Sequence, residues 1–265
     1  MSDARLFLSF TSLTDSSKHT AYNEWHQLDH LPENLALPGV AWGDRWVRSP
    51  DCAAVAHVPD PAYRHHEYAV AYWFREPVDD AVAQWTALNQ RALWWGRRPE
   101  LAWTRREPVG FFDPVSSHAV ERVLVGPAAI RYRPHRGVHL TLSRVAGPGE
   151  PAMVEHMRRI RRELLPAVLD VPGVAGASIY RFAAPAAGFG SETAEADDGL
   201  LLRVLHLDDD PVATTRLLTQ RCPDWIRGSA TEDVLSSSPF RTISPWEWDW
   251  FSNGAEAPPE AGAPR

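Results

Sequence analysis

The chain contains two copies of one pattern, and this repetition limits its fold more than any other feature. Leu31–Val40 aligns without a gap with Leu165–Val174, so that a Leu-Pro pair and a later Pro-Gly-Val recur 134 residues apart. Flanking segments also match, 5–10 with 138–143 and 44–48 with 178–182. Solenoid repeats have periods of about 20–50 residues. The longer period here predicts a duplicated domain.

Each copy is expected to run strand, helix, strand, strand, helix, strand, from its alternating and helical apolar patterns. The predicted strands are 5–13, 40–48, 67–75, 119–125, 138–145, 174–182, 199–207 and 240–250, and the helices are 18–31, 78–95, 151–165 and 210–221. This order is the ferredoxin-like split βαβ arrangement, which leaves one sheet face bare. We therefore predict an α+β fold in which two tandem βαββαβ repeats pack sheet to sheet as an internal dimer, curled into a barrel.

The predicted boundaries follow from the repeat. Residues 1–134 form an N-terminal repeat, 135–251 form a degenerate C-terminal repeat, and 252–265, rich in Pro, Ala, Gly and Glu, are expected to be a disordered tail. Residues 183–198 have a similar composition, and a mobile loop is expected there.

Composition narrows the class of protein. A hydrophobic content of 44% across 265 residues is enough for a sizeable core, and a net charge of −7 argues against nucleic acid or an anionic membrane as partner. We see no apolar run of membrane-spanning length and no signal-peptide pattern. The two cysteines, Cys52 and Cys222, have no metal-binding spacing. A cytoplasmic protein is the simplest expectation.

The first predicted helix carries polar groups where its copy is apolar. Tyr22, His26 and His30 lie four residues apart and therefore share one helix face. In the second copy, Ile160 and Leu164 stand in place of the two histidines. We predict that both imidazoles point inward. A buried imidazole is costly without a partner, so this face is a candidate functional site.

Several chemistries are compatible with this face. An imidazole titrates near neutral pH and can both accept and donate a proton, so His30 and His26 are candidate acid/base residues, with Asp29 or Tyr22 as orienting groups. A helical His-x3-His pair supplies only two metal ligands, and nothing fixes a third, so no metal site is expected. Haem with an axial histidine stays an alternative, because the twelve tryptophans can line a flat pocket.

A family resemblance rests on these residues. The run Tyr22-Asn23-x-Trp25-x-x-x-Asp29-His30-Leu31-Pro32-Glu33, followed by Leu37-Pro38-Gly39-Val40 and a strand bearing Arg45, resembles EthD-type members of the dimeric α+β barrel superfamily. The resemblance implies a pocket between sheet and helices, with His30 on the recurrent helix histidine and with Arg45 and Trp46 nearby. The superfamily includes cofactor-free monooxygenases, cyclases, isomerases and haem enzymes, so fold does not settle function.

The leading hypothesis is a cofactor-independent enzyme that uses acid/base chemistry on a hydrophobic aromatic or polyketide-like small molecule, as an isomerase, cyclase or monooxygenase. The alternatives are a haem-binding oxygenase or dehydratase and a non-catalytic ligand-binding accessory protein. A homodimer of the chain is also considered. The candidate catalytic residues are His30, His26, Asp29 and Tyr22, and the candidate substrate-binding residues are Arg45, Trp46, Tyr72 and Trp25.

Overall fold

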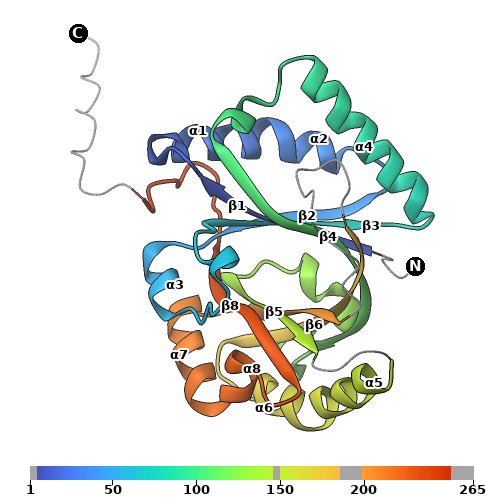
Figure 1. Cartoon of the computed structure of the whole chain (residues 1–265), viewed down its shortest axis with the longest axis vertical. Helices are drawn as coiled ribbons and strands as arrows, with labels where there is room; N and C mark the ends of the chain where they lie inside the picture. The colour runs from blue at the N-terminus through green and yellow to red at the C-terminus, as the bar shows by residue number, and fades with distance from the viewer. Residues whose placement is uncertain (1–4, 146–149, 186–198, 252–265) are drawn as a thin grey trace.

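The computed structural model describes residues 5–145, 150–185 and 199–251, and the two halves of the chain repeat one order of elements (Figure 1). The first half contains β1 (Arg5–Leu13), α1 (His19–Trp25), η2 (His26–His30), α2 (Leu31–Leu35), β2 (Val40–Val47), α3 (Pro50–Val55), β3 (Tyr68–Phe74), α4 (Val78–Trp94) and β4 (Thr104–Ala119). The second contains β5 (Gly137–Val145), α5 (Glu150–Arg159), η7 (Ile160–Leu164), α6 (Leu165–Leu169), β6 (Val174–Pro185), β7 (Leu200–Leu207), α7 (Pro211–Arg221), α8 (Pro223–Arg227) and β8 (Glu232–Thr242). Short 3-10 turns are η1 (Ser16–Lys18), η3 (Pro61–Tyr63), η4 (Pro99–Ala102), η5 (Glu121–Val123) and η6 (Pro127–Tyr132).

The strands close into one antiparallel barrel in the order β1-β3-β2-β8-β5-β7-β6-β4. Two strands join the halves, because β4 pairs with both β1 and β6 while β8 pairs with both β5 and β2. The expected fold, two βαββαβ repeats combined as an α+β barrel, is confirmed. The junction between β2 and β8 is short, with Trp46 paired to Thr242 and Val47 to Arg241.

The inside of the barrel is a packed core. Alternate residues of every strand point inward, so that Leu8 of the first half and Leu140 of the second belong to one buried cluster. Trp73 crosses this core and donates a hydrogen bond from Nε1 to the Tyr180 hydroxyl, at 3.1 Å. Each fully buried large side chain contributes roughly 1.5–3 kcal/mol. The described residues that point into the barrel therefore form a mostly apolar core shared by the two halves.

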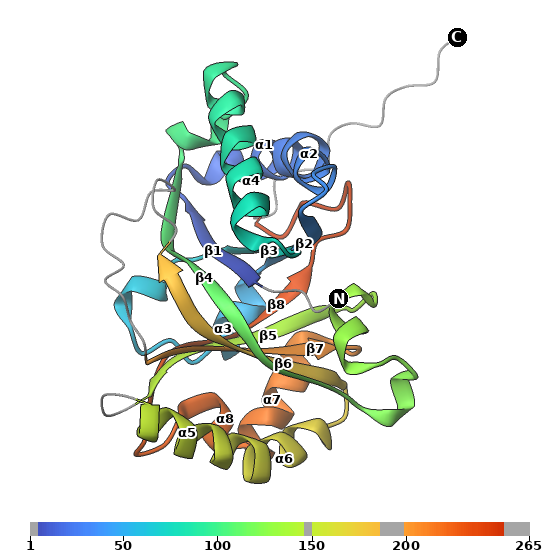
Figure 2. The same cartoon turned by 90° about the vertical axis from the view of Figure 1, so that its right-hand side faces the viewer.

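The helices cover the outer faces of the two sheets. α1, α2 and α4 lie over the first-half strands, and α5 to α8 lie over the second-half strands at the opposite end of the molecule (Figures 1 and 2). The helix-facing residues of β1, β2 and β3 are covered by α1, η2, α2 and α4, and Val47 and Tyr68 also pack with Trp103 and with the segment that follows β8. Within the described residues, no helix is both long enough and apolar enough to cross a membrane.

Both halves widen their first helix into a π turn at the same place. The turns η2 and η7 are each followed directly by a Leu-Pro pair, at Pro32 and Pro166. Proline donates no backbone hydrogen bond, and its ring collides with the carbonyl four residues earlier. A wider turn before the proline relieves that collision, so the helix does not end near Leu31, as the sequence predicted, but continues to Leu35.

The fourth strand of each half was predicted about ten residues too late. β4 occupies Thr104–Ala119 in place of 119–125, and β8 occupies Glu232–Thr242 in place of 240–250. β4 holds two prolines, Pro108 and Pro114, which are typical of turns or strand irregularities, and its pairing registers shift near both. β8 contains a Ser-Ser-Ser-Pro run, which also looks unlike a strand. Bulges reconcile such sequences with pairing.

The segments outside the main strands and helices differ in part from what the sequence predicted. The segment between the predicted strands 40–48 and 67–75, for which no element was predicted, contains the short helix α3. Residues 243–251 do not extend a strand; Trp248, Trp250 and Phe251 pack against a first-half cluster that includes Tyr22 and Tyr68. The expected tail, 252–265, and most of the expected mobile loop, 186–198, lie outside the described residues.

Candidate functional site

A small cavity lies between the first-half sheet and its helices. Its volume is about 30 Å³, enough for one or two water molecules. Its walls come from β1, β3, α1, η2, α4, the segment before η4 and the start of β4. The lining residues are Phe7, Ser9, Thr11, Tyr22, His26, His30, Val70, Tyr72, Trp85, Asn89, Arg98 and Arg106. Both histidines face this cavity, so their predicted inward orientation is confirmed.

The two imidazoles form part of an aromatic cluster. His26 is buried and His30 partly exposed, and their ring centroids lie 5.1 Å apart, edge to face. Trp25 stacks on His30 at 4.8 Å. Tyr22 meets His26 edge-on at 5.9 Å. The four-residue spacing read from the sequence thus brings Tyr22, His26 and His30 together, with Trp25 behind them.

Asn34, one turn further along the helix, holds the His30 ring. Its side-chain Nδ2 donates to the His30 carbonyl at 2.5 Å and lies 3.3 Å from the ring Nδ1. An amide N–H is only a donor, so this contact favours the tautomer of His30 with its proton on Nε2. Asn34 is 2% exposed. Sequence reasoning missed it because it ended the helix near Leu31.

The two imidazoles are neutral at physiological pH. Burial lowers the pKa of His26 well below its ordinary value, and the positive charge of Arg45 adds to this. Burial and the charges of Arg98 and Arg106 have the same effect on the pKa of His30. A neutral imidazole can accept a proton on one nitrogen and donate one from the other.

Three arginines surround the histidines with one carboxylate between them. Arg98 Nε and Arg106 Nη2 both bind the same oxygen of buried Glu100, at 2.6 Å and 2.9 Å. Arg45, 2% exposed, lies on β2 with its guanidinium over the rings of Tyr22 and Tyr68, at 5.1 Å and 5.5 Å. Arg45 interacts with the Tyr22 hydroxyl but forms no ion pair with a carboxylate among the described residues.

Sequence reasoning did not single out Arg98, Arg106 or Glu100. They come from η4 and the irregular start of β4, where no apolar periodicity indicates which side chains point inward. Arg45 was expected near the pocket, and it adjoins the cavity through its neighbours Tyr22 and Tyr72.

Tyr72 is placed as expected. Its ring lines the cavity, and its buried hydroxyl has no hydrogen-bond partner. Gly43, its cross-strand neighbour, makes room for the ring, since a Cβ there would lie 2.7 Å from it. Burial raises the pKa of Tyr72, so the hydroxyl stays protonated and can donate to a ligand.

Two expected site residues point elsewhere. Trp46 lies in the barrel core and donates from Nε1 to His135 Nε2 at 3.0 Å, because successive strand residues alternate sides and Arg45 takes the helix side. Asp29 binds Arg97 at 2.7 Å on the outer surface, and Glu33 binds the same guanidinium at 2.6 Å. Asn34, not Asp29, therefore contacts the His30 ring.

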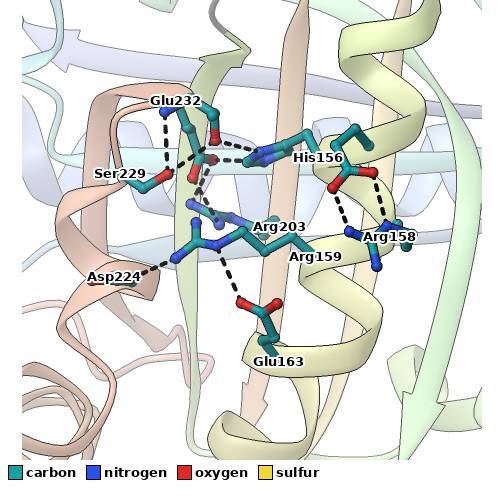
Figure 3. Close-up of polar contacts among 10 residues, drawn as sticks. His156, Arg158, Arg159, Glu163, Arg203, Asp224, Ser229 and Glu232 are labelled. Carbon is teal, nitrogen blue, oxygen red and sulfur yellow. Dashed lines mark hydrogen bonds and ion pairs between the residues drawn. The ribbon is translucent and has the colours of Figure 1, made fainter.

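The matching region of the second half is differently built. Ile160 and Leu164 are buried in an apolar cluster. Beside them, Arg203 pairs with Glu232 at 2.9 Å, and His156 Nε2 lies 3.6 Å from the same carboxylate (Figure 3). All three side chains are at most 1% exposed. Here the buried cation has its counter-ion within the chain.

The described residues contain no group of three His, Cys, Asp or Glu side chains placed to hold a metal ion. The first-half cavity is far below the roughly 300 Å³ that a drug-sized ligand occupies. A second-half hollow of about 510 Å³ is large enough, but its described lining has no His, Cys or Tyr. A third, of about 660 Å³, contains His65 and His66 but is an open groove among Arg48, Arg64 and Arg105.

The chain resembles known proteins in its fold and not in its sequence. No protein-family model matches the sequence, and no curated protein is similar to it. Among solved structures, a protein provisionally named a chlorite dismutase shares 11% identity at a TM-score of 0.53, over 95% of this chain and 98% of its own. A protein provisionally named a monooxygenase, from Fusobacterium nucleatum, shares 8% identity at a TM-score of 0.51, over 92% and 94%. The fold is a dimeric α+β barrel. At these identities the similarity establishes the fold alone.

Proposed function

We propose that the first-half cavity is the active site of an enzyme that moves a proton on a small acidic organic molecule. The observation that carries this proposal is the meeting of two neutral imidazoles, His26 and His30, with a buried excess of guanidinium charge. Perturbed titratable groups in a cavity are typical of catalytic sites. At the matching helix positions the second half carries Ile160 and Leu164, and its buried Arg203 is paired with Glu232.

The histidines act as a general acid/base pair. His30, with the tautomer that Asn34 favours, presents a proton donor, and His26, whose Nδ1 has no hydrogen-bond partner, supplies an accepting nitrogen. General acid/base catalysis by positioned side chains contributes about 10²–10⁴-fold to rate. Removing a proton from an acidic C–H or O–H bond leaves negative charge on the adjacent oxygen.

Arg45, Arg98 and Arg106 stabilise that charge, and the Tyr72 hydroxyl donates to the oxygen. In a dry site such preorganised charge is often the largest part of catalysis. Isomerisation, cyclisation and oxygenation of an acidic substrate all begin with this proton removal, so each remains within the proposal. The small cavity volume means that the acidic end of the molecule enters it, while an aromatic or polyketide-like remainder packs towards Trp25 and the partly exposed His30.

Solvent-deuterium exchange tests the proposal without an identified substrate. The chain is incubated in D₂O with a panel of 1,3-diketones, β-keto acids and aryl ketones, and C–H to C–D exchange is followed by NMR. We expect enzyme-dependent exchange that His30→Asn and His26→Asn abolish. Exchange that survives in both variants contradicts the acid/base role. Binding without any exchange across the panel favours the non-catalytic accessory protein.

The finer family assignment is part of the same proposal. We propose an EthD-type origin with an internal duplication, supported by the Tyr22-to-Glu33 motif and by the matching π turns before Pro32 and Pro166. We also propose a homodimer, because Trp94 and Trp95 at the end of α4 are 84% and 55% exposed. Sedimentation velocity of the chain and of Trp94→Glu tests this, and a monomeric wild-type chain at micromolar concentration refutes it.

A further inference from the structure

The cavity is surrounded by more positive than negative buried charge. Arg98 and Arg106 share one oxygen of Glu100, and the other Glu100 oxygen has no hydrogen-bond partner. Arg45 forms no ion pair among the described residues, because its neighbour Asp44 lies on the other side of β2, 3.6 Å from His135, and acts on Arg45 only at longer range. Asp29 and Glu33 do not compensate, because both bind Arg97 on the outside. Holding a buried cation without a counter-ion costs several kcal/mol. A fold keeps such an arrangement where a ligand supplies the missing charge.

The second half shows how this barrel balances a buried arginine. Arg203 stacks on Trp225 at 4.7 Å, as Arg45 lies over Tyr22 and Tyr68, but Arg203 also has the Glu232 carboxylate at 2.9 Å (Figure 3). The two arginines occupy the same row of helix-facing positions, Arg45 paired across strands with Val70 and Arg203 with Ile179. The internal carboxylate is the element that the first half lacks.

We infer that the substrate carries a carboxylate, and that this group binds in the first-half cavity as the counter-ion of Arg45, Arg98 and Arg106. The inference rests on the proposed function for identifying the cavity as the substrate site. A carboxylate matches the planar guanidinium groups and fits a space of about 30 Å³ better than the larger tetrahedral phosphate. It also has the chemistry of the group that Glu232 supplies in the second half.

A bound carboxylate has a consequence for the histidines. The arginine charges lower the pKa of both imidazoles, and the anion offsets those charges. Binding the substrate therefore makes His26 and His30 stronger bases at the moment when a base is needed. An uncharged analogue enters a site whose imidazoles remain poor proton acceptors.

Acetate and acetamide provide a matched pair of probes, alike in size and different in charge. Their dissociation constants are measured on the whole chain by titration calorimetry, with ¹³C-acetate line broadening as a second readout, at fixed chloride and pH 7.5. We expect acetate to bind at least about tenfold more tightly than acetamide, and Arg45→Met to remove at least about tenfold of that affinity. A smaller ratio, or a variant that binds acetate as the wild-type chain does, overturns the inference.

Two control variants test whether acetate binds in the first-half cavity. Arg158 and Arg161 line the second-half hollow, and Arg158 is exposed and paired with Glu155. The double variant Arg158→Met/Arg161→Met should bind acetate as the wild-type chain does; loss of binding there would place the anion in the wrong half. His30→Asn should keep acetate binding within about threefold while losing exchange activity. If the wild-type chain binds acetate and His30→Asn keeps exchange activity, only the acid/base function is refuted. If His30→Asn loses exchange activity but the wild-type chain does not bind acetate, only the carboxylate inference is refuted.

Discussion

The two halves of the barrel place one arginine each in the same row of helix-facing positions, on different strands. In the first half Arg45 of β2 pairs with Val70 of β3, and in the second Ile179 of β6 pairs with Arg203 of β7. Only the second-half arginine has a carboxylate partner, Glu232. The skeleton therefore tolerates a buried cation in either half, and the missing counter-ion marks the half that is open to a ligand.

The helices that cover the two sheets also differ in polarity. Positions that carry imidazoles and an amide in the first half carry aliphatic side chains in the second: His26, His30 and Asn34 against Ile160, Leu164 and Val168. Aliphatic residues at these positions form a stable core, so the polar set is not needed for folding. Its retention in one half is best explained by chemistry, as sites that break local rules usually are.

The largest expected effect comes from replacing a histidine in each half and comparing the two exchange rates. His30→Asn should lower the exchange rate by about 10²–10⁴-fold, because the acid/base pair loses its proton donor and His26 alone cannot fill both roles. The matched change in the second half, His156→Asn, should leave the rate within about twofold, since His156 contacts Glu232 far from the cavity. The rates are measured by NMR in D₂O. Equal losses in the two variants would mean that the halves are not specialised.

Removing one charged group from each half should lower the free energy of unfolding by very different amounts. Glu232→Gln leaves Arg203 buried without a counter-ion and should lower the free energy of unfolding by about 3–5 kcal/mol. Arg45→Met removes a cation that already lacks one. Its cation–π contacts are worth roughly 0.5–2 kcal/mol, and relief from desolvation offsets them, so the loss should stay below about 1 kcal/mol.

Chemical denaturation of both variants and the wild-type chain measures the difference. Comparable losses would show that Arg45 has a structural partner and that the first half is internally balanced. The double variant Glu232→Leu/Arg203→Met serves as control, because removing both members of a buried pair is often neutral or stabilising.

Lowering the pH should destabilise the folded chain through the two buried histidines of the first half. The folded chain keeps His26 and His30 neutral below pH 6.5, where the unfolded chain binds protons, so the free energy of unfolding falls as pH decreases from about 6.5. The limit is about 1.4 kcal/mol per pH unit for each imidazole. Glu232 behaves differently: its pKa is lowered to about 2, so its contribution is complete above its ordinary range and disappears only as pH falls through about 2.

NMR titration of the histidine rings checks this directly. Neither His26 nor His30 should gain a proton until the pH is below 6.5, and Arg98→Met should move the His30 transition upward, because one neighbouring positive charge is gone. A His30 ring that is charged at pH 7 would remove the neutral acid/base pair from the mechanism.

Much of this arrangement could be predicted from the sequence because it follows period and spacing. The 134-residue match gave the repeated order of elements, and the four-residue spacing gave the shared face of His26 and His30. Strand alternation puts Arg45 and Trp46 on opposite sides of the sheet, but the sequence alone does not show which of them faces the helices. Trp46 was therefore expected at a site from which the pleat excludes it.

The rest of the site depends on irregular backbone. Arg98, Arg106 and Glu100 come from a 3-10 turn and a bulged strand, where sequence shows no periodic face. Asn34 lies beyond Pro32, which normally ends a helix, and only the π turn carries the helix past it. These are places where tertiary contacts, rather than local propensity, decide the position of the side chain.

The smallest expected effects on the exchange rate distinguish Asn34, which contacts His30 in the structure, from Asp29, which the sequence indicated as its orienting group. Asn34→Ala removes the side-chain contacts to the His30 carbonyl and ring, and should lower the exchange rate by about tenfold through loss of ring orientation. Asp29→Asn removes only part of a surface ion pair with Arg97, so its effect should be below about threefold on the rate and below about 1 kcal/mol on stability. Asn34→Asp keeps an oxygen but loses the donor, so rescue by Asn34→Gln and not by Asn34→Asp would identify donation as the function. If Asp29→Asn proves the more damaging, the carboxylate acts on His30 after all, and the first half works through a surface network rather than through its buried amide.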